Sequence, residues 1–276
     1  MKKIPYTKIS GHVLLIIGAC FMLIPFIVML STALKSQANI FAGGFAVIPT
    51  EWAAVENFQE VYQKLPIIRF MINGGIVTTL IFLIQVVIAV PCAYALAKCK
   101  FAGKRVLFNC VLWCLLIPPQ AVAIPVFLEL HAVGMLNSYA ALIVPWSISM
   151  LGIFIMRQFF LAIPDDIIDA ARMDGMGELS ILMRIMVPMA LPALTAFGIL
   201  SFIAHWNDYF WPLICLQDIK YYTPPLGISY FNTDDAGVSY GPLMAAACII
   251  TVPLLVVFLA ARDKFIQGVS IQAGVK

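Results

Sequence analysis

The 276-residue chain is 62% hydrophobic and 11% charged, with a mean hydropathy of +0.97. A water-soluble protein of this composition would expose large apolar patches, so the sequence excludes a soluble fold and indicates a membrane protein. The seven cysteines form no CxxC pair, and their odd number argues against a disulfide framework.

Six uncharged runs reach the length of about 18 residues that a helix needs to span a bilayer. In chain order they cover residues 12–34, 70–97, 106–128, 132–156, 185–207 and 236–261. They predict an all-α membrane protein with six transmembrane helices. We expect one membrane domain over 1–276, made of an N-terminal span with an outer loop (1–69), a five-span core (70–262) and a tail (263–276).

The distribution of lysine and arginine sets the expected orientation. Thirteen of the seventeen lie in segments on the same side as the N-terminus, and the positive-inside rule makes that side cytoplasmic. Both termini and the loop 157–187 are therefore predicted inside, and the loops 37–66 and 212–240 outside. The net charge of +3 is then a topology signal and requires no nucleic-acid partner.

Prolines interrupt most of the predicted spans. In lipid a freed backbone carbonyl needs a partner in the protein or in cavity water, so residues 118–125 are a candidate bend beside a pathway, with an ordinary proline kink as the alternative. Little more than residues 129–131 separates the third span from the fourth. We expect a tight helical hairpin there, at the outer face.

The longest predicted internal loop, 157–187, holds seven charged residues between 165 and 184. Its sequence predicts two short helices separated by Gly175 and Gly177, with Gly175 in the left-handed conformation that ends the first. The first helix carries a short apolar surface made of Ile167, Ile168, Ala170 and Ala171. A helix this short is only marginally stable in water, so we expect it to pack against another protein or against its own bundle.

The first of these helices carries a recognisable motif. Residues 169–175, Asp-Ala-Ala-Arg-Met-Asp-Gly, followed by Pro188 and Pro192, resemble the EAA signature of ABC importer permeases. Asp169 stands where the family usually has Glu, and Val187 precedes Pro188 where Leu is usual.

Two further segments resemble the carbohydrate branch of that family. Residues 206–212, Trp-Asn-Asp-Tyr-Phe-Trp-Pro, are similar to the end of its fifth span, and the tail residues 265–268 and 273–276 add a third similarity. The similarity is best from residue 70 onward. It is close to the shorter permease subunit of maltose-type and glycerol-phosphate-type importers.

The resemblance implies a type I ABC importer permease fold, with a cytoplasmic coupling helix between spans four and five that enters a cleft of an ATPase. The residues that it assigns to ATPase coupling are Asp169, Ala170, Ala171, Arg172, Asp174 and Gly175. The implied partners are a second homologous permease, a cytoplasmic ATPase dimer, an extracytoplasmic solute-binding protein and lipid of a bacterial-type inner membrane. The implied cargo is a carbohydrate or a polyol phosphate, such as an oligosaccharide or sn-glycerol-3-phosphate, imported by alternating access.

The energy source is expected to lie in another subunit. The sequence contains no GxxxxGK[ST] phosphate loop, since Gly103-Lys104 is only an isolated pair. ATP and Mg would be bound by the partner ATPase, and this chain is expected to hold no cofactor or metal and to be no enzyme. The three histidines, His12, His131 and His205, are too far apart in sequence to suggest a ligand cluster.

Polar residues within spans usually face the interior of the bundle or a pathway. The amides of this kind are Asn73, Gln85, Asn109, Gln120 and Asn207. For each of them, hydrogen bonding between helices is the alternative to substrate contact.

Asp208 follows the fifth span among aromatic residues. Rings beside hydrogen-bonding groups suit a sugar, whose C–H face is apolar, although an interfacial aromatic belt is equally compatible. A glycerol phosphate would instead call for a cationic site, for which Arg69 and Lys220 are the external candidates, unless both snorkel. The predicted pathway residues are Asn73, Gln120, Trp206, Asn207 and Asp208.

Two other classes stay open. A secondary transporter or channel for a small polar solute would work without an ATPase, and a membrane scaffold or enzyme subunit would show no flux. The sequence has no convincing internal repeat and no buried ionic pair, which argues against the first, and no catalytic cluster, which argues against an enzyme.

Overall fold

The computed structural model describes the backbone of residues 6–41, 47–232 and 238–272, and the side chains of 11–41, 47–231 and 238–262. The described part is built from helices, apart from one isolated β-bridge between Lys35 and Trp52. The predicted all-α class is therefore confirmed. The tail segments 265–268 and 273–276 lie outside the described side chains.

Three helices contain unbroken segments long and apolar enough to cross a membrane: α1 (Tyr6–Ala33), α4 (Ile67–Lys98) and α15 (Tyr240–Gln272). Three further candidate spans are bent. They combine α5 (Lys104–Leu116) with α6 (Ala123–Ala132), α7 (Tyr139–Ile143) with α8 (Met150–Ala162), and α10 (Glu178–Ile181) with α12 (Leu191–Trp206). The bends measure 96°, 40° and 78°. Counted this way, the described residues hold up to six spans, in the predicted order.

The chain divides into two compact units, the first of which consists of residues 1–67 and 227–252. This unit contains α1, α2 (Gln37–Phe41), α3 (Ala54–Lys64) and the first part of α15. Buried Asn57 of α3 donates to the carbonyls of Ala33 (2.8 Å) and Lys35 (2.9 Å). A Cβ on Gly241 of α15 would fall 2.6 Å from Asn57 Oδ1, so the close approach of these helices requires glycine there.

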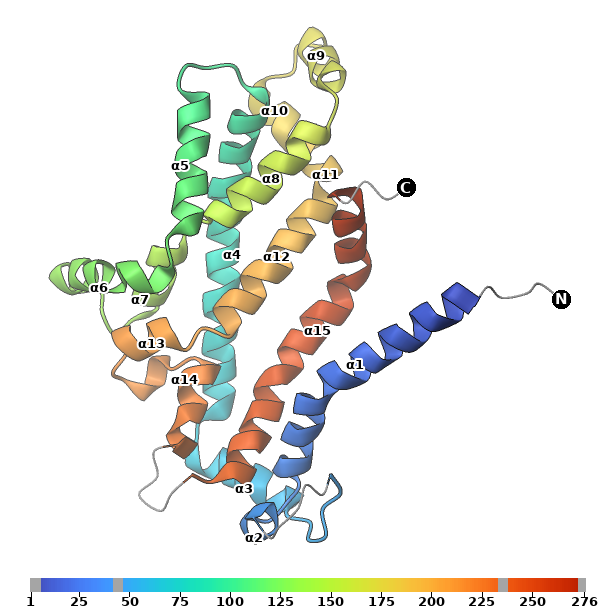
Figure 1. Ribbon diagram of the computed structural model, residues 1–276. Coiled ribbons are helices and arrows are strands. Elements are labelled where there is room, and N and C mark those ends of the chain that lie inside the picture. Colours follow the sequence, from blue (N-terminus) through green and yellow to red (C-terminus); the bar gives the residue numbers. More distant parts are fainter. Residues whose placement is uncertain (1–5, 42–46, 233–237, 273–276) are drawn as a thin grey trace. The chain divides into compact units, whose positions relative to one another are not determined.

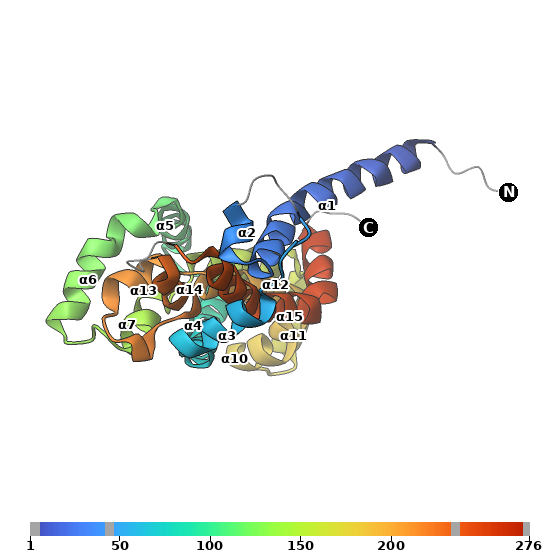
Figure 2. The ribbon, with the colours of Figure 1, turned by 90° about the horizontal axis from the view of Figure 1, so that it is seen from below.

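The second unit, residues 68–226 and 253–276, is organised around α4. Near its C-terminal end α4 packs with α8, α9 (Asp165–Met173) and α10 in an apolar core that includes Met156 and Phe160. In its N-terminal half, α4 shares a second core with α6, α7 and α13 (Phe210–Cys215), which includes Leu142 and Trp211. Figure 1 shows α9 beside α10 at the top and α6, α7 and α13 together lower down, and the view from below in Figure 2 also shows α6, α7 and α13 together.

The 96° bend between α5 and α6 comes from Pro118 and Pro119. The helical region is disfavoured for a residue before proline, and Ile117 and Pro118 have extended ψ values of 118° and 135°. The predicted bend within 118–125 is thus confirmed. The 13 residues of α5 extend only about 20 Å, which is less than the ~30 Å hydrocarbon core of a bilayer.

The tight hairpin predicted at 129–131 is wrong. These residues lie inside α6, which continues to Ala132, and the chain turns afterwards within 133–138. Gly134 and Asn137 take positive φ values of 69° and 56° in that turn, a conformation that glycine and asparagine tolerate best. The left-handed residues, and not the charged ones, therefore mark where the chain reverses.

A π-helical segment, Leu182–Met186, connects α10 to α11 (Val187–Met189). In an α-helix Ile181 and Met186 would point about 140° apart, because each residue turns by about 100°. The wider π-turn, with its i→i+5 bonding, brings both side chains toward one face. Both are fully buried, so the additional residue in the turn lets the segment bury two large side chains.

Candidate functional site

Within the predicted internal loop 157–187, α9 and α10 form the two short helices that the sequence predicts. Two aspartates occupy the first turn of α9 and an arginine the last, which the helix dipole favours. Gly175, at φ 80°, ends α9: its N–H donates to the carbonyl of Arg172, and the Met176 N–H to that of Ala171, both at 3.0 Å. These bonds form a Schellman motif, so the predicted left-handed Gly175 is confirmed.

The apolar residues of α9 lie on two faces. Ile168 and Ala171, three residues apart, are buried against the core of the second unit. Ile167, Ala170 and Met173 face away, and the Met173 side chain is 88% exposed. The single apolar surface expected from the sequence is therefore divided, and Ala171 belongs to its inward half.

Arg172 bends back toward the bundle. Its Nη1 donates to Asp169 Oδ1 at 3.1 Å and its Nε to Glu178 Oε1 at 2.8 Å. The Tyr94 hydroxyl of α4 donates to Glu178 Oε2 at 2.5 Å. The hydrogen bond from Arg172, and then that from Tyr94, holds the pKa of Glu178 below its usual value, while the Glu178 carboxylate raises the pKa of Arg172. This network ties α9 and α10 to α4.

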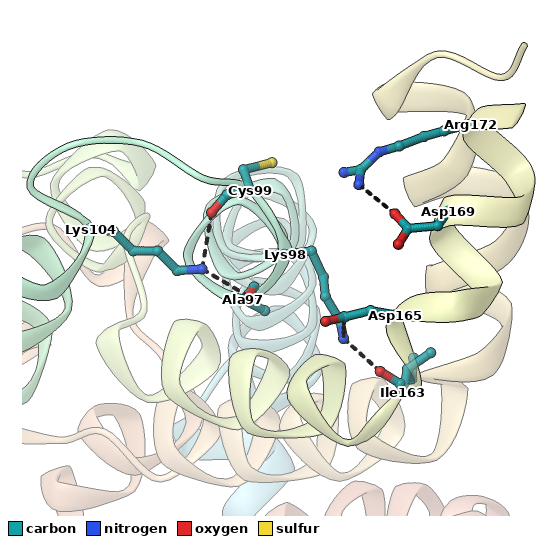
Figure 3. Close-up of polar contacts among 8 residues, drawn as sticks. All are labelled: Ala97, Lys98, Cys99, Lys104, Ile163, Asp165, Asp169 and Arg172. Atoms are coloured by element: carbon teal, nitrogen blue, oxygen red, sulfur yellow. Dashed lines mark hydrogen bonds and ion pairs between the residues drawn. The ribbon is translucent and has the colours of Figure 1, made fainter.

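A second charged contact joins the start of α9 to the end of α4 (Figure 3). Lys98 Nζ lies 2.5 Å from Asp165 Oδ1 and donates to the Ile163 carbonyl at 2.6 Å, and the Lys98 side chain is only 5% exposed. The hydrogen bond from Lys98 lowers the pKa of the Asp165 carboxyl. Lys104 donates to two carbonyls at the C-terminal end of α4 and closes the turn toward α5.

The predicted coupling residues occupy α9 and the turn after it, but they differ in what they contact. Asp169 and Arg172 form the ion-pair network, Ala171 packs inward, Gly175 ends the helix, and Ala170 and Asp174 are exposed. Sequence reasoning missed the residues that hold this loop in place, which are Tyr94, Lys98 and Glu178. Their partners lie 65 to 84 residues away in the chain, apart from the Arg172–Glu178 pair, so no local pattern reveals them.

Asn73, one of the predicted pathway residues, is fully engaged in the fold. Its side chain is 1% exposed, its Nδ2 donates to the carbonyls of Lys220 and Tyr222, both at 2.9 Å, and its Oδ1 accepts from the Tyr139 hydroxyl at 2.7 Å. It therefore joins α4 to α7 and to the segment after α13. This is the hydrogen-bonding alternative considered for the amides in spans.

Trp206 and Asn207 also lie apart from the cavity described next. The Trp206 ring is buried and stacks on Phe202, with ring centroids 5.4 Å apart. The Asn207 amide is exposed and donates to the Ile203 carbonyl of its own helix at 2.9 Å.

Gln120 and Asp208, the remaining two predicted pathway residues, line one cavity of about 190 Å³, which we call the Asp208 cavity. The bend between α5 and α6 contributes Gln120, and Trp146, His205 and Trp211 complete most of the wall. Asp208 Oδ1 accepts a hydrogen bond from the backbone N–H of Trp211 at 3.2 Å. Burial raises the pKa of the Asp208 carboxyl, against the opposing effect of backbone N–H donors.

No group of three or more His, Cys, Asp or Glu side chains suited to a metal ion gathers within the described ranges. What the second unit offers is therefore a rigidly held surface helix and an aromatic cavity containing one carboxylate.

Residues 85–271 match the family described as the inner membrane component of binding-protein-dependent transport systems. The chain belongs to this family. Membership confirms the resemblance to ABC importer permeases and places the permease in a membrane, as part of a system that depends on a binding protein.

Three relatives align over nearly the whole permease. The sn-glycerol-3-phosphate transport system permease protein of Shigella flexneri is 27% identical over 96% of this chain and 96% of its own. The diacetylchitobiose uptake system permease protein of Streptomyces coelicolor is 28% identical over 94% and 86%. The arabinooligosaccharides transport system permease protein of Halalkalibacterium halodurans is 28% identical over 95% and 96%.

The fold also has a solved counterpart. A chain in the crystal structure of a bacterial ABC transporter involved in import of the acidic polysaccharide alginate matches with a TM-score of 0.80 and 24% identity, over 96% of this permease and 98% of that chain. The predicted type I importer permease fold is thereby confirmed.

Proposed function

We propose that the permease is the translocation subunit of an ATP-driven carbohydrate importer. It pairs with a second permease, receives substrate from an extracytoplasmic binding protein and passes it inward by alternating access while an ATPase dimer hydrolyses ATP. Two relatives named for oligosaccharide uptake support a carbohydrate cargo. The relative named for sn-glycerol-3-phosphate transport favours that polyol phosphate as the second candidate.

The outward face of α9 is the observation that carries this proposal. Its inward face is fixed by Ile168 and Ala171 and by the ion pairs to α4 and α10, while Met173 and Ala170 stay exposed. Methionine adapts to varied partner surfaces, and an alanine lets a partner approach closely. A helix held rigidly on one side can transmit a displacement from the ATPase to α4 without deforming. We place this face in the cytoplasm, with both termini.

The test is ATP-dependent uptake by the assembled importer in proteoliposomes. Ala170→Trp places a large ring on the outward face and should lower uptake at least about tenfold, equivalent to ~1.4 kcal/mol of docking free energy. It should also weaken co-purification of the ATPase. Ala171→Trp is less specific, because it would overpack the core beneath α9.

Ala162→Trp is the matched control, because it adds the same ring at the exposed end of α8. It should leave uptake and ATPase co-purification unchanged. Wild-type uptake by the Ala170→Trp importer, or flux through the permease without an ATPase, would contradict the proposal.

A further inference from the structure

The Asp208 cavity has aromatic walls. The rings of Trp146 and Trp211 are perpendicular, with centroids 6.1 Å apart, and the His205 ring lies 6.0 Å from that of Trp146. The buried indole N–H of Trp146 has no hydrogen-bond partner among the residues that the structure describes. This N–H has almost no accessible surface, so Trp146 offers the cavity its ring, and an apolar ligand face would contact the rings.

The polar groups of the cavity are a carboxylate and an amide. Asp208 is held in place by the Trp211 N–H, and carboxylate oxygens accept the hydrogen bonds that hydroxyl groups donate. Gln120 offers both a donor and an acceptor on the facing bend between α5 and α6. Together they match the rim of a polyhydroxylated ring.

No positive charge is available in the cavity. Its lining includes neither lysine nor arginine, so His205 is the one residue there that can become a cation. Gln85 Nε2 donates to the Trp146 carbonyl at 2.7 Å, while Ser201 Oγ donates to Gln85 Oε1 at 2.7 Å, which fixes the orientation of the amide.

The orientation of the Gln85 amide determines the protonation state of His205. Gln85 Nε2 also lies 3.2 Å from His205 Nε2, and an amide nitrogen can only donate. His205 Nε2 therefore accepts, and the imidazole is neutral. The cavity offers a carboxylate with no counter-charge among its lining residues.

We propose that the Asp208 cavity is a subsite for one uncharged sugar unit and that it discriminates against phosphorylated and uronate ligands. The inference rests on the proposed function and names its substrate class. At about 190 Å³ the cavity is smaller than the ~300–1,000 Å³ of typical ligand pockets, which suits a single ring of an oligosaccharide. An anionic ligand would be repelled by Asp208 in surroundings where charges are poorly screened.

The experiment measures equilibrium binding of radiolabelled ligands to the assembled importer in lipid nanodiscs, without the binding protein. The probes are diacetylchitobiose and arabinotriose as neutral sugars, and sn-glycerol-3-phosphate and an alginate trisaccharide as anions. Wild type should bind at least one neutral probe more tightly than either anion. Asp208→Asn, which keeps an acceptor for the Trp211 N–H, and Gln120→Ala, on an exposed residue, should each raise the Kd of that neutral probe about tenfold.

Glu129→Gln is the matched control, since it removes one carboxylate charge from α6, outside the cavity, and should leave every Kd unchanged. Unchanged Kd values in both cavity variants, preference for an anion or no binding of either neutral probe would overturn the inference. ATP-dependent uptake of the same probes is measured in parallel in proteoliposomes, with the binding protein present. If ATP drives uptake and the variants bind like wild type, the subsite alone is wrong; if ATP drives no uptake of any probe, the proposed function fails and the subsite with it.

Discussion

At the residue scale, Asn73 shows how an amide within a span serves the fold. Its three hydrogen bonds join α4 to Tyr139 and to the carbonyls of Lys220 and Tyr222. Asn73→Ala would leave these groups unpaired, and a buried unpaired polar group costs about 1–3 kcal/mol. We therefore expect a free energy of unfolding lower by roughly 2–3 kcal/mol in total, because water partly replaces the lost partners.

The measurement is the unfolding transition of the purified permease in detergent. Asn109→Ala provides the control, because Asn109 is an amide of α5 that is only half-buried. Equal shifts in the two variants would show that the Asn73 hydrogen bonds contribute little.

At the element scale, substitutions at two glycines near the end of α9 separate the effect of backbone conformation on stability from the effect of packing. A Cβ added at Gly175 or at Gly177 would meet no heavy atom within 4 Å, but φ is 80° at Gly175 and −74° at Gly177. Gly175→Val should therefore strain the end of α9 by roughly 1–2 kcal/mol, whereas Gly177→Val avoids this penalty.

Hydrogen exchange of the α9 amides in the assembled importer provides the readout. Gly175→Val should speed exchange at the C-terminal end of α9 and reduce uptake, and Gly177→Val should behave like wild type. The same exchange rates in both variants would mean that the Schellman motif does not stabilise α9.

At the scale of the whole molecule, the orientation of the permease in the membrane is predicted from the distribution of lysine and arginine. Lys100 lies exposed in the turn between α4 and α5, and Gln217 lies exposed after α13. In a cysteine-free permease, a membrane-impermeant thiol reagent should label Gln217→Cys from outside intact cells and Lys100→Cys only in inverted vesicles. The opposite labelling would reverse the predicted topology.

The sequence predicts the helical class and the number of spans because both follow from long uncharged runs. It also predicts the end of α9, since Gly175 acts locally, and the bend at Pro118–Pro119. It misplaces the reversal after α6 because the left-handed residues 134 and 137 lie within a run that reads as continuous helix.

The cavity and the anchoring of α9 depend on contacts between distant residues. Gln85, Trp146, Ser201 and His205 meet across three helices, and Tyr94 meets Glu178 across 84 residues. Two of the five predicted pathway residues, Gln120 and Asp208, line the Asp208 cavity. The sequence shows which side chains have the chemistry to bind a sugar, but the packing of distant segments decides which of them meet.

The π-helical segment Leu182–Met186 also sets the direction in which α9 faces. A π-turn holds one more residue than the α-turn it replaces, so removing a single residue would restore a regular helix and rotate the preceding segment by about 100° about its axis. α9 and α10 would turn together, because Arg172 and Glu178 join them. The length of this five-residue segment thus fixes the angle at which α9 and α10 meet α4, and one deletion would separate Lys98 from Asp165 and Tyr94 from Glu178 while turning the outward face of α9 to another direction.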